Sequence, residues 1–98
     1  MPAARRPRLV VPGLLPERVQ PRWWEGTQAG YDQGYHALDP NQPLPKPPTT
    51  FTAEEKTVWW MGYRTAHPLG FRDRQEGLPL TLPPDQPEHI WPDDEDGA

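Results

Sequence analysis

The chain has 98 residues, of which 16 are proline and none is cysteine, and only 34% are hydrophobic. These values exclude a packed core over the whole length, disulfide bonds and thiolate zinc sites, so folding must depend on aromatic burial or on a partner. The net charge of −4 averages two unlike regions, since residues 1–74 carry +3 and residues 75–98 carry −7. A mildly basic body with an acidic tail is compatible with nucleic-acid contact.

Residues 1–20 are predicted to form an extended, proline-rich basic arm and not a domain. Its apolar residues can at best lie on another surface; they are Leu9, Val10, Leu14 and Leu15. The apolar run is too short and too broken by Pro12 and Gly13 for a signal peptide, and no stretch approaches the roughly 20 residues of a membrane span. We therefore expect a cytoplasmic protein.

A first helix is predicted over residues 21–38. Pro21 suits the first helical position, apolar residues from Trp24 to Leu38 recur at helical spacing, and Asp39-Pro40 supplies a stop. The helix contains Gly26, Gly30 and Gly34, each of which costs about 1 kcal/mol relative to alanine.

Glycines four residues apart share one helix face, and this spacing has two interpretations. Their face offers a groove without side chains, in which a second helix or an aromatic ring can approach the backbone. The alternative is that the glycines merely fray the helix. We favour close packing.

Residues 41–48 form a proline-loaded linker, interpreted as a semi-rigid spacer, with a PxxP ligand for SH3-like grooves as the alternative. A capping box follows, in which the Thr52 hydroxyl and the Glu55 side chain each satisfy the other's backbone amide. It predicts a second helix over residues 53–66, closed by His67-Pro68. One stripe of this helix carries Trp59, Gly62, Tyr63 and Ala66.

The expected fold class is therefore all-α: a small antiparallel two-helix hairpin with an extended proline-rich N-terminal arm, a linker and a C-terminal tail. The chain divides into an arm at 1–20, the helical hairpin at 21–74 and an acidic tail at 75–98. The predicted core consists of Trp24, Tyr31, Tyr35, Trp59 and Tyr63. In the tail, Ile90 and Trp91 are candidate anchors for a partner or for the hairpin, and a solvated end is the alternative.

Catalytic and cofactor sites are not predicted. The chain has no Ser or Cys nucleophile and no P-loop, and its three histidines lack the spacing of metal ligands. We therefore expect no enzyme activity, no metal, no cofactor and no small-molecule substrate.

Two segments resemble the signature of the ribosome modulation factor family. The first is Gly26-Thr27-Gln28-Ala29-Gly30 with Gly34, which is similar to a GxQAG element. The second runs from Lys56 to Ala66 and contains WxxGxRxA in Trp59, Gly62, Arg64 and Ala66. The resemblance covers Gly26 to Ala66, under half of the chain. It implies two helices joined by a linker that bind the small ribosomal subunit near the end of its RNA and reduce translation.

Carried over by position, the resemblance implies helix packing for the glycines and Trp59 and phosphate contact for Lys56 and Arg64. We extend each role to further residues of the two helices. The packing set is Gly26, Gly30, Gly34, Trp59, Gly62 and Tyr63. The nucleic-acid-binding set is Lys56, Arg64, Arg22 and Trp60. Independently, Lys56 and Arg64 lie two turns apart and each lies within about 40° of one helix face, so both can address one backbone strand. Trp60 precedes Arg64 by one turn, which suits cation–π support or base stacking.

Departures from the family pattern leave a second function open. The linker is longer, arm and tail have no counterpart, and Glu25, Glu54 and Glu55 stand where the family tends to basic or neutral residues. Less positive charge weakens RNA binding by counterion release. The chain is thus predicted to bind the ribosome and rRNA of the small subunit. The alternative is an inhibitor or adaptor, of a phage type that mimics nucleic-acid charge, which binds a host protein.

Overall fold

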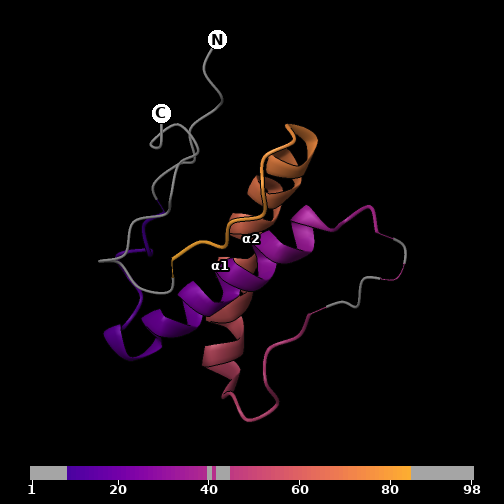
Figure 1. Ribbon diagram of the computed structural model, residues 1–98. Helices are drawn as coiled ribbons and strands as arrows, with labels where there is room; N and C mark the ends of the chain where they lie inside the picture. The colour runs from indigo at the N-terminus through magenta and orange to yellow at the C-terminus, as the bar shows by residue number, and fades with distance from the viewer. Residues whose placement is uncertain (1–8, 40, 42–44, 85–98) are drawn as a thin grey trace.

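The computed structural model describes residues 9–39, 41 and 45–84, and these residues form two packed α-helices with no strand among them. Helix α1 is Gln20–Tyr35, preceded by the short 3-10 helix η1, Glu17–Val19, and helix α2 is Ala53–Gln75 (Figure 1). The predicted all-α fold of two packed helices is confirmed. Within the described part of the chain, no helix is long and apolar enough to cross a membrane.

Helix α1 ends three residues before the predicted boundary at Leu38. A turn follows Tyr35, in which the amide of Ala37 donates to the Gly34 carbonyl and that of Asp39 to the His36 carbonyl. Leu38 lies in this turn and is 71% exposed. The apolar spacing therefore continues beyond the helix, but Leu38 gains little burial there and does not stabilise another helical turn.

Helix α2 begins at the predicted capping box. The amide of Glu55 donates to Thr52 Oγ1 at 3.2 Å, and the amide of Thr52 donates to Glu55 Oε1 at 2.8 Å. Two amides that lack partners within the helix are thereby satisfied. The capping box is confirmed as the start of α2.

The predicted end of α2 at Ala66 is wrong, because the helix passes through Pro68 and continues to Gln75. Pro68 is exposed, and its missing amide releases only the carbonyl of the exposed residue Arg64 to solvent. The helix ends at Gln75, and Gly77, two residues further on, has a φ of +76°. Leu78 donates to the Asp73 carbonyl at 2.9 Å and Gly77 to that of Arg74 at 3.2 Å, which is the hydrogen-bond pattern of a Schellman motif.

The two helices touch along a seam of glycines contributed by both. A Cβ built on α1 at any of its three glycines would collide with a backbone carbonyl of α2. The pairs follow one another along the seam: Gly26 with Trp59, Gly30 with Tyr63, and Gly34 with His67. Conversely, a Cβ built on α2 at Gly62 or Gly70 would collide with the α1 carbonyl of Trp23 or Tyr31, respectively. The backbones therefore approach so closely that no side chain fits between them.

The predicted antiparallel arrangement is wrong. Along the seam, residue numbers rise in the same direction in both helices, so the helices are parallel. Figure 1 shows both helices running from the bottom of the view to the top, crossing at an angle. Residues 36–52 connect them in the sequence. An α-helix of 16 residues is about 24 Å long, and the connecting residues can span more than that distance. A parallel pair is therefore within reach of the linker.

The arm and the start of the tail cover α1 on sides away from the seam. Leu9, Val11 and Leu15 pack against a buried cluster of Val19, Trp23, Trp24 and Val58. Val10 and Leu14 point outward, with 71% and 98% of their surface exposed. The described arm is thus part of the fold.

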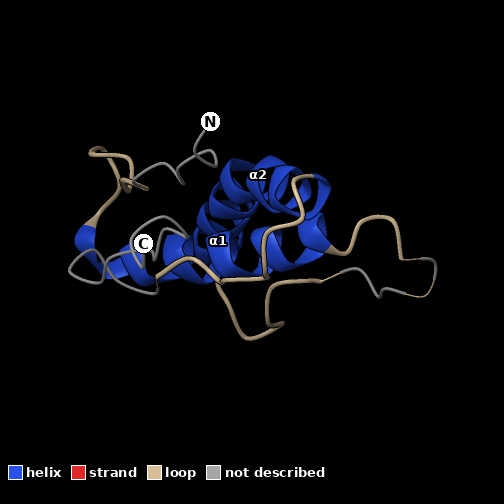
Figure 2. Ribbon diagram, turned by 45° about the horizontal axis from the view of Figure 1, so that its top comes forward, coloured by secondary structure: helices blue, strands red, loops and turns tan. Residues whose placement is uncertain are grey.

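Residues 78–84, which we call the strap, run back along α1 (Figure 2). Tyr35 Oη donates to the Leu78 carbonyl at 2.5 Å, and Gln28 Nε2 donates to the Pro83 carbonyl at 3.0 Å. Between these points, Tyr31 Oη donates to Asp73 Oδ2 at 2.5 Å and accepts from the Thr81 amide at 3.4 Å. Tyr31 thereby joins α1, α2 and the strap. Sequence reasoning assigned Tyr31 to the core but missed Asp73, which is fully buried.

The predicted aromatic core is partly right. Trp24, Tyr31 and Trp59 are buried, whereas Tyr35 and Tyr63 are half-buried. The buried hydrophobic residues that the predicted core lacks are Val19, Trp23, Val58 and Ala66. Val19, Trp23 and Val58 form one buried cluster with Trp24.

Candidate nucleic-acid interface

The two predicted phosphate contacts, Lys56 and Arg64, both lie on α2, and neither forms an ion pair with any residue that the structure describes. Arg64 is exposed and Lys56 is half-buried. Two helical turns separate them, a rise of about 12 Å along the axis. Their charges are therefore available to the same anionic strand.

Aromatic rings form a continuous ladder between and beyond these cations. Trp60 contacts Trp59 at 4.8 Å and Tyr63 at 5.1 Å between ring centroids, and Trp59 stacks on Tyr63 at 5.6 Å. His67 extends the ladder from Tyr63, again at 5.6 Å. Partial burial raises the pKa of the Tyr63 hydroxyl, so this ring stays neutral well above physiological pH. We call the surface formed by Lys56, Trp60, Tyr63, Arg64 and His67 the α2 face.

Trp59 anchors the ladder from below. Its side chain is only 4% exposed, while Trp60, Tyr63 and His67 are half-buried and keep part of each ring accessible. Because Trp59 is buried beneath these partly open rings, it holds them in place before binding. Less side-chain entropy is then lost when a ligand binds. Trp60 was predicted in this role, but Tyr63 was assigned to packing and His67 to a helix end. The signal that could have found them is the i, i+3, i+7 spacing of 60, 63 and 67 on a helix extended past Pro68.

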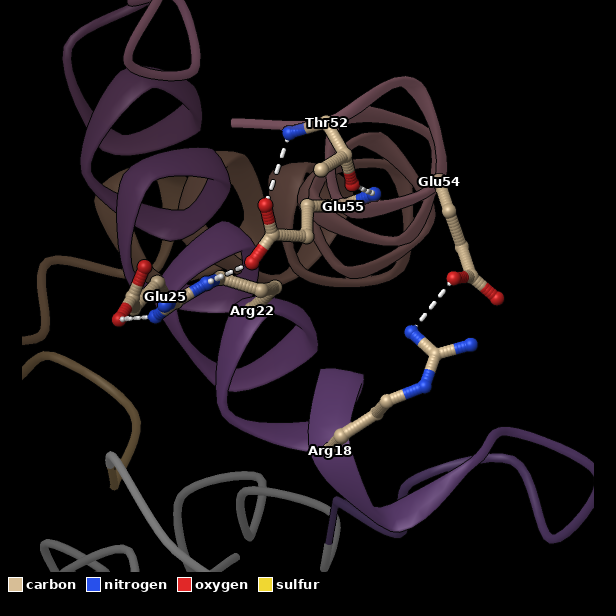
Figure 3. Close-up of polar contacts among 6 residues, drawn as sticks. All are labelled: Arg18, Arg22, Glu25, Thr52, Glu54 and Glu55. Atoms are coloured by element: carbon tan, nitrogen blue, oxygen red, sulfur yellow. Dashed lines mark hydrogen bonds and ion pairs between the residues drawn. The ribbon is translucent and has the colours of Figure 1, made fainter. Parts of the chain in front are cut away.

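Arg22, the remaining predicted nucleic-acid contact, is engaged within the protein (Figure 3). Its Nε donates to Glu55 Oε2 at 3.1 Å and its Nη1 to Glu25 Oε2 at 2.9 Å. The guanidinium also lies 4.7 Å from the centroid of the Phe51 ring. The hydrogen bond that Arg22 donates to Glu55 is the largest cause that raises the pKa of Arg22. The structure therefore separates Arg22 from Lys56 and Arg64.

This arrangement follows from the parallel direction, which brings the first turns of the two helices together. Arg18 Nη1 lies 2.6 Å from Glu54 Oε1, one residue before the Arg22 partner on α2 (Figure 3). The pKa of Glu55 is lowered mainly by the backbone hydrogen bond from Thr52 and next by Arg22. Exposed ion pairs of this kind add little stability, but they offset charge locally.

The consequence concerns the three glutamates that weaken the electrostatic case for RNA. Glu25 and Glu55 share Arg22, and Glu54 pairs with Arg18. Each carboxylate thus has a cation beside it at the N-terminal end of the pair. The charges left without a partner among the described part of α2 are Lys56 and Arg64, so its outer face is locally positive although the chain is acidic.

The remaining predicted residues divide into two groups. The packing glycines Gly26, Gly30, Gly34 and Gly62 all lie in the seam, and Gly70, which the short predicted helix omitted, extends it. Trp59 and Tyr63 supply seam carbonyls as well as rings. The candidate anchors Ile90 and Trp91 lie outside the described residues.

Comparison with known proteins adds no relative: no protein-family model, curated protein or solved structure matches this chain. The α2 face is therefore interpreted from its own chemistry. Partly open rings offer stacking surfaces, and an ammonium and a guanidinium two turns apart offer phosphate contacts.

Proposed function

We propose that this chain is a non-catalytic binding protein of the ribosome modulation factor type. It binds rRNA of the small ribosomal subunit through the α2 face and down-regulates translation in the cytoplasm. The observation that carries the proposal is the aromatic ladder of α2 together with Lys56 and Arg64, two cations without an ion-pair partner among the described residues. The family resemblance supports it, because Lys56 and Arg64 are the positions that match the basic residues of that motif.

The division of labour on the α2 face follows from general nucleic-acid chemistry. Lys56 and Arg64 contact phosphates and set position, while Trp60 and His67 stack on bases. Base stacking on an aromatic side chain contributes about 1–3 kcal/mol per base. Two phosphate contacts give a slope of log K against log salt of only about −1.4 for a single strand. Affinity therefore depends on the rings as well as on charge, which suits a chain whose net charge is negative.

Co-sedimentation with purified small subunits tests the proposal. The wild-type chain is expected to migrate with the subunits in a sucrose gradient at 50 mM salt, and Lys56→Glu/Arg64→Glu is expected to stay at the top. Trp60→Ala is expected to weaken binding about tenfold or more, because it removes one stacking partner. The helix signal in circular dichroism is expected to be the same in all variants, since these side chains lie outside the seam.

A matched pair of single variants separates position from net charge. Arg64→Glu and Lys46→Glu each reverse one exposed cation, and only the first lies on the α2 face. We expect Arg64→Glu to lose most of the binding and Lys46→Glu to retain it. Equal losses in the two variants, or a wild-type chain that never migrates with small subunits at low salt, would refute the proposal.

A protein partner is the second candidate, and one observation favours it. Leu80 and Leu82 of the strap are 40% and 45% exposed, and the acidic residues of the tail follow them in the chain. An apolar strip beside acidic residues suits a basic protein surface. Capture of a specific partner that survives nuclease treatment and is lost in Leu80→Ser/Leu82→Ser would favour this function over rRNA binding.

A further inference from the structure

The strap fixes the point from which the acidic tail leaves the fold. Gln28 Nε2 on α1 holds the Pro83 carbonyl at 3.0 Å, and Pro83 is fully buried. The seam pairs Gly26 with Trp59 and Gly30 with Tyr63, so the level of Gln28 along the pair corresponds to α2 between these two residues. The tail therefore starts beside the middle of the α2 face when measured along the helices.

The charge of the tail is complementary to that face. Residues 85–98 contain six acidic residues, no Lys or Arg, and the apolar pair Ile90-Trp91. On α2, Lys56 and Arg64 have no ion-pair partner among the described residues, and partly open rings lie between them. Elsewhere, Arg18, Arg22 and Arg74 are already paired with Glu54, Glu55 and Asp39, respectively.

The reach of the tail is sufficient. An extended chain spans about 3.3 Å per residue, so the seven residues from 85 to 91 cover about 23 Å. A helix with its side chains has a diameter of about 10–12 Å, and the glycine seam brings the two helix axes unusually close. Trp91 is therefore within reach of α2 from Pro84 when residues 85–91 are extended.

We propose that the acidic tail, residues 85–98, docks on the α2 face of its own chain and competes there with nucleic acid. Trp91 lies against the aromatic ladder, and the acidic run 93–96 faces Lys56 and Arg64. The inference rests on the face used in the proposed function and adds its regulation. The covalent link to the fold gives the tail an effective concentration of about 1 mM at this face. Tail binding with a dissociation constant of about 0.1 mM then closes the face about ten to one and weakens nucleic-acid binding about tenfold.

The absence of cysteine in the sequence allows a direct test on the full-length chain. A nitroxide spin label is attached to the thiol introduced by Ala98→Cys, and the tryptophan indole N–H signals are recorded by NMR. At 50 mM salt, the Trp60 signal is expected to broaden more than those of Trp23 and Trp24, which lie on α1. Raising the salt to 500 mM is expected to restore the Trp60 signal, because screening weakens exposed charge pairs.

Variants of the labelled chain then identify the contact. Trp91→Ala, and separately the quadruple change Asp93→Asn/Asp94→Asn/Glu95→Gln/Asp96→Asn, are expected to abolish the broadening. Arg64→Glu is expected to abolish it, and Lys46→Glu is expected to leave it intact. An unbroadened Trp60 signal in the wild-type sequence, or equal broadening in Arg64→Glu and Lys46→Glu, would overturn the proposal.

A mixed sample distinguishes contact within one chain from contact between copies. In it, one set of chains carries the isotope label and no nitroxide, and the other set carries the nitroxide and no isotope label. Broadening in this mixture at the same concentration would overturn docking in cis. Because no RNA or ribosome is present, tail docking and ribosome binding can fail independently. The neutralised-tail variant is expected to bind small subunits about tenfold more tightly if both hold.

Discussion

Helices α1 and α2 share one seam but differ in what covers the rest of their surfaces. α1 is enclosed by α2, by the arm through Leu9 and Leu15, and by the strap through Tyr31 and Tyr35. α2 is enclosed mainly on its seam, while residues such as Arg64, Thr65 and Pro68 are exposed. The difference implies that α1 holds the fold together and that α2 presents the face that we propose as the binding surface. Substitutions should therefore affect stability along α1 and the seam, and binding on the outer side of α2.

The largest expected effect comes from adding a methyl group to the seam of α1. In an isolated helix, Gly30→Ala would gain about 1 kcal/mol. In this protein the new Cβ would collide with the backbone carbonyl of Tyr63, which cannot move without shifting α2. We expect the collision to outweigh the gain, with a net loss of about 3 kcal/mol and a decrease in Tm of more than 10 °C. Thermal denaturation followed by circular dichroism measures it.

Gly13→Ala is the control for this effect, because nothing lies within 4 Å of a Cβ built at Gly13. Its Tm is expected to match that of the wild type. If Gly30→Ala is as stable as Gly13→Ala, the helices do not approach as closely as the seam requires, and the enclosed character of α1 is lost with it.

The next largest effect is expected at the point where α1, α2 and the strap meet. Tyr31→Phe removes the hydroxyl that donates to the buried Asp73 carboxylate and accepts from the Thr81 amide. Removing a donor from a buried carboxylate costs about 2 kcal/mol, which corresponds to roughly 10 °C in Tm. Tyr63→Phe is the matched control, since the Tyr63 hydroxyl makes no hydrogen bond to the described residues, and a change within about 0.5 kcal/mol is expected. Similar losses in both variants would show that the strap contributes nothing through Tyr31.

Much of the seam could be predicted from the sequence, because glycines at 26, 30 and 34 repeat at the period of one helix face. The capping box at Thr52 could be predicted equally well, since it depends only on neighbouring residues. The direction of one helix relative to the other could not be predicted. A glycine stripe accepts a partner running either way, and residues 36–52 are long enough for both connections. The ion pairs between the helices, Arg18 with Glu54 and Arg22 with Glu55, depend on this direction. They could therefore not be predicted either.

The end of α2 shows a different limit. Pro68 is usually a helix stop, and on local rules the boundary at Ala66 was reasonable. The seam continues, however, with Gly70 against Tyr31, and Asp73 is held by the Tyr31 hydroxyl. Tertiary contacts thus offset the local cost of proline. His67 was consequently placed at a helix end, although it lies in the aromatic ladder of the candidate interface.

Pro68→Ala tests whether the proline on the exposed side of α2 lowers the free energy of unfolding. The substitution restores an amide that can donate to the Arg64 carbonyl, and it removes a residue that costs about 3 kcal/mol in a helix interior. Proline also restricts the unfolded chain, which offsets about 1 kcal/mol of the gain. We expect a net stabilisation of about 1–2 kcal/mol and a higher Tm.

Pro21→Ala provides the comparison on α1, where proline occupies the first turn and its missing amide has no helical partner. This substitution is expected to leave Tm unchanged or to lower it slightly. Should Pro68→Ala fail to raise Tm relative to Pro21→Ala, α2 would have to be interrupted at Pro68 in solution.

The smallest expected effect concerns the ion pairs that join the first turns of the two helices. The pKa of Glu55 is lowered in the folded protein by the Thr52 amide and by Arg22. A lowered folded pKa means that the carboxylate stabilises the fold above its unfolded pKa of about 4.3 and that this stabilisation disappears as pH falls through the lower, folded value. Glu55→Gln keeps an oxygen for the Thr52 amide but loses the charge, so its Tm should be slightly below that of wild type at pH 7. The difference should narrow as the pH falls through the folded pKa of Glu55. Glu17→Gln, at an exposed position with no ion pair to the described residues, should show no such pH-dependent difference. A gap between wild type and Glu55→Gln that does not narrow over this pH range would mean that the charge on Glu55 does not couple α1 to α2.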